Sequence, residues 1–241
     1  MSSLDVARTR MIESQLRPNK VTDDRVLSAF ANIRRELFVP EHLRQVAYID
    51  GDLPLGEGRY LMELMVAARL LQAARVESTD VVLVVGPGTG YEAALAAMLA
   101  PTVIALEESP DLARRARAAL VEHAIAAVNI VEGPLRQGHR ARAPYDVILF
   151  GGAVAEVPVG IASQLAEGCR LLAVVRPRGR PRYLDETHWR SVCATGYIRR
   201  CYSLAPGFCT GACFRVLLRP HARNRANPRD PARRSSPGSP R

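Results

Sequence analysis

The sequence predicts an α/β fold, with a doubly wound, mostly parallel sheet and an N-terminal helical cap. Three observations predict it. Short β-branched runs alternate with helical patterns between residues 79 and 176, as in parallel sheets whose strands are joined by helices. The first of these runs ends in a glycine-rich turn. Residues 1–78 have helical patterns in place of such runs.

The expected cap contains two helices and a loop. Thr22-Asp23-Asp24 precedes the apolar positions of 26–33, which is the pattern of a capped amphipathic helix. Residues 53–58 read as a turn-rich loop because proline and two glycines interrupt them. Residues 62–74 are apolar around most of a helical circumference, which predicts a buried helix.

The expected core starts at residues 80–85, a continuous apolar run typical of a strand buried on both faces. The glycine turn follows, and then a helix from Tyr91 that Pro101 stops. A second strand over 102–106 is closed by Glu107. The remaining expected elements are a helix capped by Ser109 and running through Ala119, strands at 128–131, 145–150 and 171–175, and a helix over 157–166.

Composition excludes several classes of protein. The 241 residues are 48% hydrophobic and 24% charged, close to the average of a soluble globular domain. These values exclude wholesale disorder, a collagen-like fibre and a small disulfide scaffold. No apolar stretch in the sequence reaches the length of a membrane span. The first residues lack the apolar core of a secretory signal, so we expect a cytoplasmic protein without a membrane partner.

Charge and cysteine are concentrated near the C-terminus. Residues 219–241 hold seven arginines and one aspartate, a net charge of +6 out of the chain's +9. We interpret them as a solvated, disordered basic tail with no specific nucleic-acid partner. Four of the five cysteines, at 193, 201, 209 and 213, lack a close pair. Their spacing does not indicate a zinc site, and we expect free thiols and no metal.

The glycine turn and the acid after the second strand predict a cofactor site. A glycine-rich turn admits a ligand close to the backbone, and the next helix offers free N–H groups. Glu107 follows Gly90 by 17 residues, where an acid accepts both ribose hydroxyls. The alternative is a plain tight turn with a solvated acid. The predicted residues of an adenosine-type cofactor site are Gly86, Gly88, Thr89, Gly90 and Glu107.

The residues alone leave the cofactor open, because 88–93 also fit the G-x-G-x-x-A pattern of nicotinamide dinucleotide enzymes. Residues 11–176, however, resemble protein-L-isoaspartate O-methyltransferases of the class I S-adenosylmethionine-dependent methyltransferases. The particular signals are the L-P-L-G-x-G loop and the A-x-x-E-x-P ending. The segments that carry the resemblance are 34–40 (RRELFVP), 53–58 (LPLGEG), 82–91 (VLVVGPGTGY), 105–107 (ALE), 143–149 (APYDVIL), 151–158 (GGAVAEVP) and 164–171 (QLAEGCRL).

The resemblance implies a function. The family methylates the free carboxylate of L-isoaspartyl (D-aspartyl) residues in damaged proteins, and the ester then cyclises to a succinimide. It implies S-adenosyl-L-methionine as cofactor, isoaspartyl proteins or peptides as partners, and a peptide mouth formed by 53–62 and 151–158. We expect a monomer. The domains expected are the cap and mouth loop (1–78), the methyltransferase core (79–218) and the tail (219–241).

The chain departs from the family pattern around the expected cleft. The family carries an orienting hydroxyl in a T-x-S-x-P stretch, where this chain has Tyr60 and Met62 in the threonine and serine positions. A family acid near the adenine is replaced by Pro134, and an acid of the first strand by Val84. These changes predict weakened activity, or a degenerate paralogue that binds the cofactor as a regulatory or interaction module. For Met62 a place in the core is an equal alternative.

Residues 180–218 should supply the last two strands of such a sheet, and 197–202 and 214–218 are the β-like runs there. The surrounding sequence is rich in Cys, Arg, Pro and Ser, as a shifted reading of GC-rich DNA would be. We therefore hypothesise that part of 180–241 is a frameshift product. Outside the glycine turn, we expect Asp146, Glu156 and Cys169 to be structural, and we expect His123 to have no partner at catalytic spacing.

Overall fold

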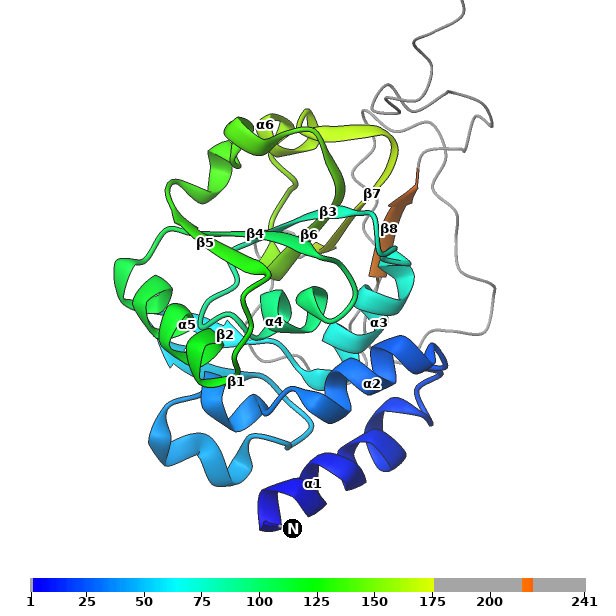
Figure 1. The fold of residues 1–241 in the computed structure, drawn as a ribbon, viewed down its shortest axis with the longest axis vertical. Helices are drawn as coiled ribbons and strands as arrows, with labels where there is room; N and C mark the ends of the chain where they lie inside the picture. The colour runs from blue at the N-terminus through cyan, green and yellow to red at the C-terminus, as the bar shows by residue number, and fades with distance from the viewer. Residues whose placement is uncertain (1, 176–213, 219–241) are drawn as a thin grey trace, which may run out of the picture.

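The computed structural model describes residues 2–175 and the backbone of a strand at 214–218. Within this part of the chain, a central sheet has the strand order β5-β4-β3-β6-β7-β8. Neighbouring strands run parallel from β5 to β7, and β8 is antiparallel to β7. This order and these directions confirm the doubly wound, mostly parallel sheet (Figure 1).

The described elements are as follows. The sheet contains β3 (Val81–Val85), β4 (Thr102–Glu107), β5 (Val128–Glu132), β6 (Tyr145–Val154), β7 (Leu165–Val175) and β8 (Phe214–Leu218). A separate hairpin contains β1 (Leu53–Gly56) and β2 (Arg59–Leu61). The α-helices are α1 (Ser3–Met11), α2 (Asp24–Asn32), α3 (Leu64–Ala74), α4 (Tyr91–Ala97), α5 (Pro110–Glu122) and α6 (Val159–Ala162). Short 3-10 turns cover Arg35–Phe38, Glu41–Val46, Leu135–Gln137 and Arg140–Arg142, and one π-helical turn covers Ile12–Leu16.

Two predicted helix starts are confirmed by their caps. The Asp23 side chain accepts a hydrogen bond from the backbone N–H of Arg25 at the start of α2. Ser109 accepts one from the N–H of Leu112, and Pro110 occupies the first turn of α5. Each cap satisfies a backbone donor that the helix itself leaves without a partner.

Alternate residues of the buried strands face two separate cores. In β3, Val82 and Val84 belong to the larger hydrophobic cluster, and Leu83 and Val85 belong to the smaller one. Figure 1 shows α3, α4 and α5 on one side of the sheet and α6 on the other. Because both faces are covered, β3 is apolar along its whole length.

The N-terminal segments pack on the same large core as the sheet. That core is one cluster whose members range in sequence from Met11 to Val174. The helices α1 and α2 form an outer layer beneath α3 and α4 (Figure 1). Phe38 lies 5.5 Å from the ring of Tyr91 and 5.6 Å from that of His123, measured between ring centroids. These contacts fix the segment before the hairpin against the start of α4 and the end of α5.

Two expected elements differ in the structure. Residues 53–58 are not a plain loop but most of the β1–β2 hairpin, whose two-residue turn places Glu57 and Gly58 at positive φ, as tight hairpin turns require. The helix expected over 157–166 is shortened to α6 (Val159–Ala162). The chain enters β7 at Leu165 because the Gln164 carbonyl already accepts a hydrogen bond from the Tyr145 N–H of β6.

The predicted strand at 214–218 is present as β8. The run at 197–202, the four cysteines beyond 192 and the basic tail at 219–241 lie outside the described residues, so the proposals about them stay predictions. In the described part, no helix is long and apolar enough to cross a membrane. The same residues contain no group of three His, Cys, Asp or Glu side chains arranged to hold a metal ion.

Candidate functional site

The glycine turn lies between β3 and α4, and its conformation needs glycine. Gly86 and Gly88 have φ values of +68° and +59°, a region that side-chain-bearing residues rarely adopt. A Cβ atom at Gly88 would come within 2.8 Å of Leu55 Cδ1 in the hairpin. The turn therefore lets the hairpin approach the carboxyl end of the sheet. In open α/β sheets ligands bind at this edge.

Thr89 and Gly90 serve the turn itself. The Thr89 side chain is buried, and its hydroxyl donates a hydrogen bond to the Phe38 carbonyl oxygen. Gly90 is the N-cap residue of α4 with φ of 96°. The Thr89 hydroxyl is thus committed to the N-terminal layer in this structure. The backbone of the turn, in contrast, faces Glu107.

Glu107 is a completely buried carboxylate at the end of β4. Its Oε2 atom accepts a hydrogen bond of 2.9 Å from the Gly88 N–H, and its Oε1 atom accepts from the N–H groups of Glu108 (2.9 Å) and Ser109 (3.1 Å). Three backbone donors thus fix the Glu107 side chain in one orientation. The structure brings together the predicted glycine turn and the predicted acid.

Arg59 completes this arrangement, and it was absent from the residues predicted from sequence. Its Nη1 and Nη2 atoms lie 2.9 and 3.1 Å from Glu107 Oε1 and Oε2, a two-pronged ion pair. Nη2 also donates to the Gly86 carbonyl at 3.0 Å. Arg59 and Glu107 are 48 positions apart, and nothing in either local pattern indicates the contact. The hairpin, which was expected to be a loop, brings them together.

A cavity of about 430 Å³ opens beside this pair. It is lined from the carboxyl ends of the strands: by Gly86 after β3, Glu108 after β4, Leu135 and Arg136 after β5, and residues 152–156 at the end of β6 and beyond. Arg59 is the hairpin residue that lines it. The two segments expected to form a substrate mouth, 53–62 and 151–158, therefore both contribute to this one cavity.

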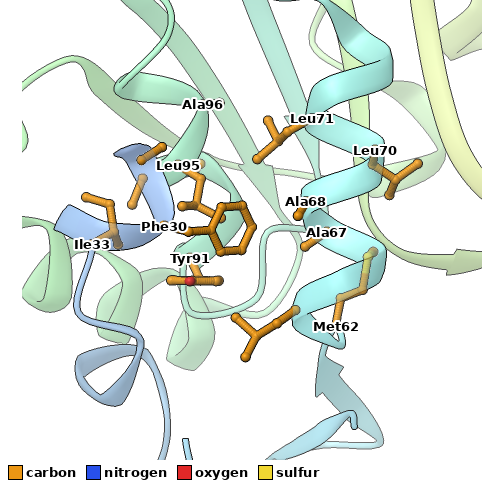
Figure 2. Close-up of a cluster of buried hydrophobic side chains, with 14 of the residues drawn as sticks. Phe30, Ile33, Met62, Ala67, Ala68, Leu70, Leu71, Tyr91, Leu95 and Ala96 are labelled. Carbon is orange, nitrogen blue, oxygen red and sulfur yellow. The ribbon is translucent and has the colours of Figure 1, made fainter. Parts of the chain in front are cut away.

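Tyr60 and Met62 do not line the cavity. The Tyr60 side chain is 46% exposed on β2, and Met62 is 6% exposed within the large hydrophobic core. Figure 2 shows Met62 among apolar side chains of α3 such as Ala67 and Leu70. The Met62 carbonyl oxygen accepts a hydrogen bond of 3.0 Å from Arg35. In this structure Met62 therefore packs in the core.

A buried polar group lies behind the glycine turn. The Arg35 side chain is fully buried, and its guanidinium carbon is 5.4 Å from the centre of the Tyr91 ring. Burial lowers the pKa of Arg35 and raises that of the Tyr91 hydroxyl. Burial also raises the pKa of the neighbouring Glu92 carboxyl to about 7, against the opposing effect of Arg35. These groups support the turn from the side of the N-terminal layer, and they do not line the cavity.

The remaining candidates have structural partners. Asp146 accepts a hydrogen bond from the Val81 N–H, which joins the starts of β6 and β3. His123, for which no partner at catalytic spacing was expected, accepts a hydrogen bond of 2.9 Å from the backbone N–H of Arg34 and stacks on Phe38. Cys169 is half-buried, and burial raises the pKa of its thiol to about 11. A thiol with that pKa is a poor nucleophile near neutral pH.

Glu156 and Pro134 flank the cavity. Glu156 lies 3.5 Å from Arg136 in an exposed ion pair. Pro134 precedes the 3-10 turn Leu135–Gln137. The next residue, Leu135, lines the cavity with an apolar side chain. Pro134 itself has no side-chain hydrogen-bond acceptor.

The fold and this site agree with what the chain is similar to. Residues 7–191 match the family model of protein-L-isoaspartate(D-aspartate) O-methyltransferase. The protein-L-isoaspartate O-methyltransferase of Methanoculleus marisnigri is 42% identical over 171 residues, which are 71% of this chain and 78% of the relative. A solved protein-L-isoaspartate O-methyltransferase aligns with a TM-score of 0.61 at 27% identity, over 70% of this chain and 55% of that one.

The fold also resembles a Plasmodium falciparum protein solved with S-adenosyl-L-homocysteine, with a TM-score of 0.60 at 18% identity, over 74% of this chain and 86% of that one. The family is S-adenosylmethionine-dependent, which favours that cofactor over a nicotinamide dinucleotide. The family model covers the glycine turn, Glu107 and the whole described cavity. Residues 7–191 match the family model, and the Methanoculleus marisnigri relative is 42% identical, so the chain belongs to the protein-L-isoaspartate(D-aspartate) O-methyltransferase family.

Proposed function

We propose that this protein methylates the free carboxylate of L-isoaspartyl and D-aspartyl residues in damaged proteins, with S-adenosylmethionine as the methyl donor. The observation that carries the proposal is the buried, backbone-held Glu107 beside the glycine turn, whose neighbour Glu108 and ion-pair partner Arg59 line a cavity of about 430 Å³. The matches to the family and to relatives named for this activity support it.

The residues present fit the cofactor. Two carboxylate oxygens in fixed positions suit the two hydroxyls of a ribose, and the Gly86–Gly90 turn leaves its backbone open to a ligand. A Cβ atom at Gly86 would meet the Arg59 guanidinium at 3.1 Å. The space at that position is therefore bounded by a side chain that can move. In this proposal Glu107 holds the ribose, and Gly86 and Gly88 form the surface under the nucleoside.

When bound, S-adenosylmethionine supplies an electrophilic methyl group attached to a sulfonium. The acceptor carboxylate is ionised near neutral pH, so the chain needs no strong base. The work of the protein is to hold the acceptor in line and to exclude water, which makes proximity and orientation the main sources of rate. In this proposal residues 152–156 and Arg59 form the walls that hold the peptide.

The proposal includes a reduced rate. Met62 has no hydrogen-bond donor to offer a carboxylate, and its side chain is buried among apolar residues. The Tyr60 phenol is exposed on the hairpin. Without an orienting hydroxyl, the rate should fall by about ten- to a hundred-fold relative to a site that has one, since such a hydrogen bond contributes roughly 1.5–3 kcal/mol.

Two measurements test the function. Calorimetry should detect S-adenosylhomocysteine binding that Glu107→Ala weakens by about ten-fold or more, because the ribose loses a charged acceptor. Initial rates of methyl transfer should be measurable on an isoaspartyl peptide and absent on the same peptide with a normal aspartyl residue. Tight NADH binding without S-adenosylhomocysteine binding would contradict the cofactor assignment. Cofactor binding with no transfer to either peptide would favour a cofactor-binding regulatory module.

A further inference from the structure

Arg59 occupies the hydrogen-bonding capacity that a ribose needs. Glu107 Oε1 accepts hydrogen bonds from the Glu108 N–H, the Ser109 N–H and Arg59, and Oε2 accepts from the Gly88 N–H and Arg59. A carboxylate has about four lone-pair sites, and five donors already surround them. The two Arg59 donors are the ones that can move away, because the other three belong to the backbone. A pair of ribose hydroxyls would therefore bind Glu107 in the places that Arg59 now occupies.

The released guanidinium would then be a cation at the cavity wall. The Arg59 side chain is 29% exposed where it now lies, and Glu107 is fully buried. A positive charge in such a place is costly without a counter-ion. The acids on the cavity lining are weak substitutes: Glu108 is exposed, and Glu156 is exposed and already lies 3.5 Å from Arg136. Exposed ion pairs contribute little.

We infer that Arg59 exchanges counter-ions: it binds Glu107 in the free protein, and once a nucleoside ribose takes Glu107, its guanidinium binds a carboxylate in the cavity. This inference rests on the proposed function. It gives Arg59 the role of recognising the acceptor, since the two-pronged geometry that now fits Glu107 fits any carboxylate. The same chemistry has two sources, the isoaspartyl carboxylate of the peptide and the amino-acid carboxylate of the cofactor.

The exchange also orders the binding events. A ribose ligand that frees Arg59 raises the affinity for a carboxylate, and by linkage the carboxylate raises the affinity for the ribose ligand equally. The peptide would then be held firmly only when the methyl donor is already present. Ordinary aspartyl carboxylates of other proteins resemble the substrate carboxylate. The requirement is useful for that reason, because a site without the methyl donor does not retain peptides.

The test is calorimetry on the full chain with Arg59→Gln. 5′-Methylthioadenosine, which has the ribose but no carboxylate, should bind the variant about ten-fold more tightly than the wild type, because no charged pair has to be broken. Arg17→Gln is the matched control. Arg17 also pairs with a glutamate, Glu13, at 3.1 Å, but both side chains are more than half exposed. The control should bind the ligand as the wild type does.

The carboxylate half is tested with two peptides in the presence of saturating 5′-methylthioadenosine. The isoaspartyl peptide should bind Arg59→Gln about ten-fold more weakly than the wild type, and its neutral carboxamide analogue should bind both proteins equally. A second outcome is that the peptides bind both proteins alike, while S-adenosylhomocysteine, unlike 5′-methylthioadenosine, gains no affinity in the variant. In that case the exchange still occurs, and the carboxylate that Arg59 binds is the amino-acid carboxylate of the cofactor.

The wild type provides a test that does not depend on the variant's folding. 5′-Methylthioadenosine should raise the affinity of the isoaspartyl peptide and leave that of the carboxamide analogue unchanged. Unchanged or weaker 5′-methylthioadenosine binding in a folded Arg59→Gln, or no effect of this ligand on any carboxylate, would overturn the inference. None of these measurements requires methyl transfer, so they separate the role of Arg59 from the proposed activity.

Discussion

At the scale of single residues, we propose that positions 60 and 62, where the family pattern has hydroxyls, limit the rate of methyl transfer. Met62 lies in the core beside α3, and Tyr60 lies on the exposed side of β2. The double change Tyr60→Thr with Met62→Ser replaces the phenol at position 60 by a smaller aliphatic hydroxyl and introduces a hydroxyl at position 62. If that hydroxyl reaches the acceptor, methyl transfer to an isoaspartyl peptide should rise by about ten- to a hundred-fold.

The double variant has a cost that must be measured beside the rate. Replacing a buried methionine by serine removes apolar contacts and adds a polar group, which should lower the free energy of unfolding by about 2–5 kcal/mol. Met62→Ala is the control, since it creates a comparable cavity without the hydroxyl. A folded, cofactor-binding double variant that is no faster than Met62→Ala would contradict the assignment of this position.

Glu63 gives the protein a pH-dependent stability. Burial, together with Asp50 and Asp52 nearby, raises the pKa of its carboxyl from 4.5 to about 7, and Arg35 opposes this. The folded state therefore binds the proton more tightly than the unfolded state. This group's contribution to stability is greatest below the unfolded pKa and is lost as the pH rises towards 7.

Glu63→Gln should remove that loss. Between about pH 5 and pH 8, the free energy of unfolding of the wild type should fall by about 1 kcal/mol more than that of the variant. The expected difference is small because solvent screens the charge of a half-buried carboxylate. Glu41→Gln, at an exposed carboxylate, is the control. The same dependence on pH in wild type and Glu63→Gln would show that Glu63 is not the group responsible. Glu92, whose pKa is also near 7, would be the next to change.

At the scale of elements, the end of β6 is packed directly against the glycine turn. A Cβ atom at Gly151 would lie 2.5 Å from the Gly86 carbonyl oxygen and 3.0 Å from Pro87 Cα, both backbone atoms that cannot turn aside. Gly151→Ala should therefore lower the free energy of unfolding by about 1–3 kcal/mol and displace the turn. The neighbouring Gly152 has no atom within 4 Å of such a Cβ.

Gly152→Ala is thus the matched control, and its stability should change by less than about 0.5 kcal/mol. Thermal or denaturant unfolding of the two variants measures the difference. Equal stabilities would mean that β6 and the glycine turn are not in contact as described. A destabilised Gly151→Ala with unchanged S-adenosylhomocysteine affinity would separate the packing role of Gly151 from the binding site.

The elements also show what the sequence can predict. The strands at β3, β4 and β6 are predictable because both faces are buried, so their central residues (81–85, 103–106 and 147–150) are apolar without interruption. The hairpin β1–β2 is not, because Pro54 and the glycines that signal a turn stand inside a strand pair of three or four residues. The start of β7 is hidden for another reason: Gly168, with φ of 82°, interrupts a strand in a position where it reads as a helix end.

The candidate site also has a part that the sequence predicts and a part that it does not. The glycine turn and Glu107 follow from the order of elements along the chain, since each lies at the carboxyl end of a strand. Arg59 and the cavity lining depend on contacts between segments far apart in sequence, such as the 48 positions between Arg59 and Glu107. Local pattern carries no information about these contacts. Pro134 was expected to leave the cavity short of an acceptor, and Leu135 beside it lines the wall.

At the scale of the whole molecule, the N-terminal layer and the sheet act as one body. One hydrophobic core runs from Met11 to Val174, and the Phe38 carbonyl holds the Thr89 hydroxyl of the glycine turn. The layer thereby positions the hairpin, the hairpin places Arg59 at Glu107, and β6 closes the cavity from the other side. The catalytic proposal depends on this chain of contacts more than on any one reactive side chain.

Repair of isoaspartyl residues by this protein can be followed on the substrate itself. The protein and S-adenosylmethionine are incubated with an isoaspartyl peptide, and the peptide is followed by chromatography and mass spectrometry. We predict that a methyl ester appears first, followed by the succinimide and then the normal aspartyl peptide, at a slow rate that Glu107→Ala lowers by about ten-fold or more when S-adenosylmethionine is below saturation. An isoaspartyl peptide that stays unmodified, with a folded protein that binds S-adenosylhomocysteine, would contradict the account.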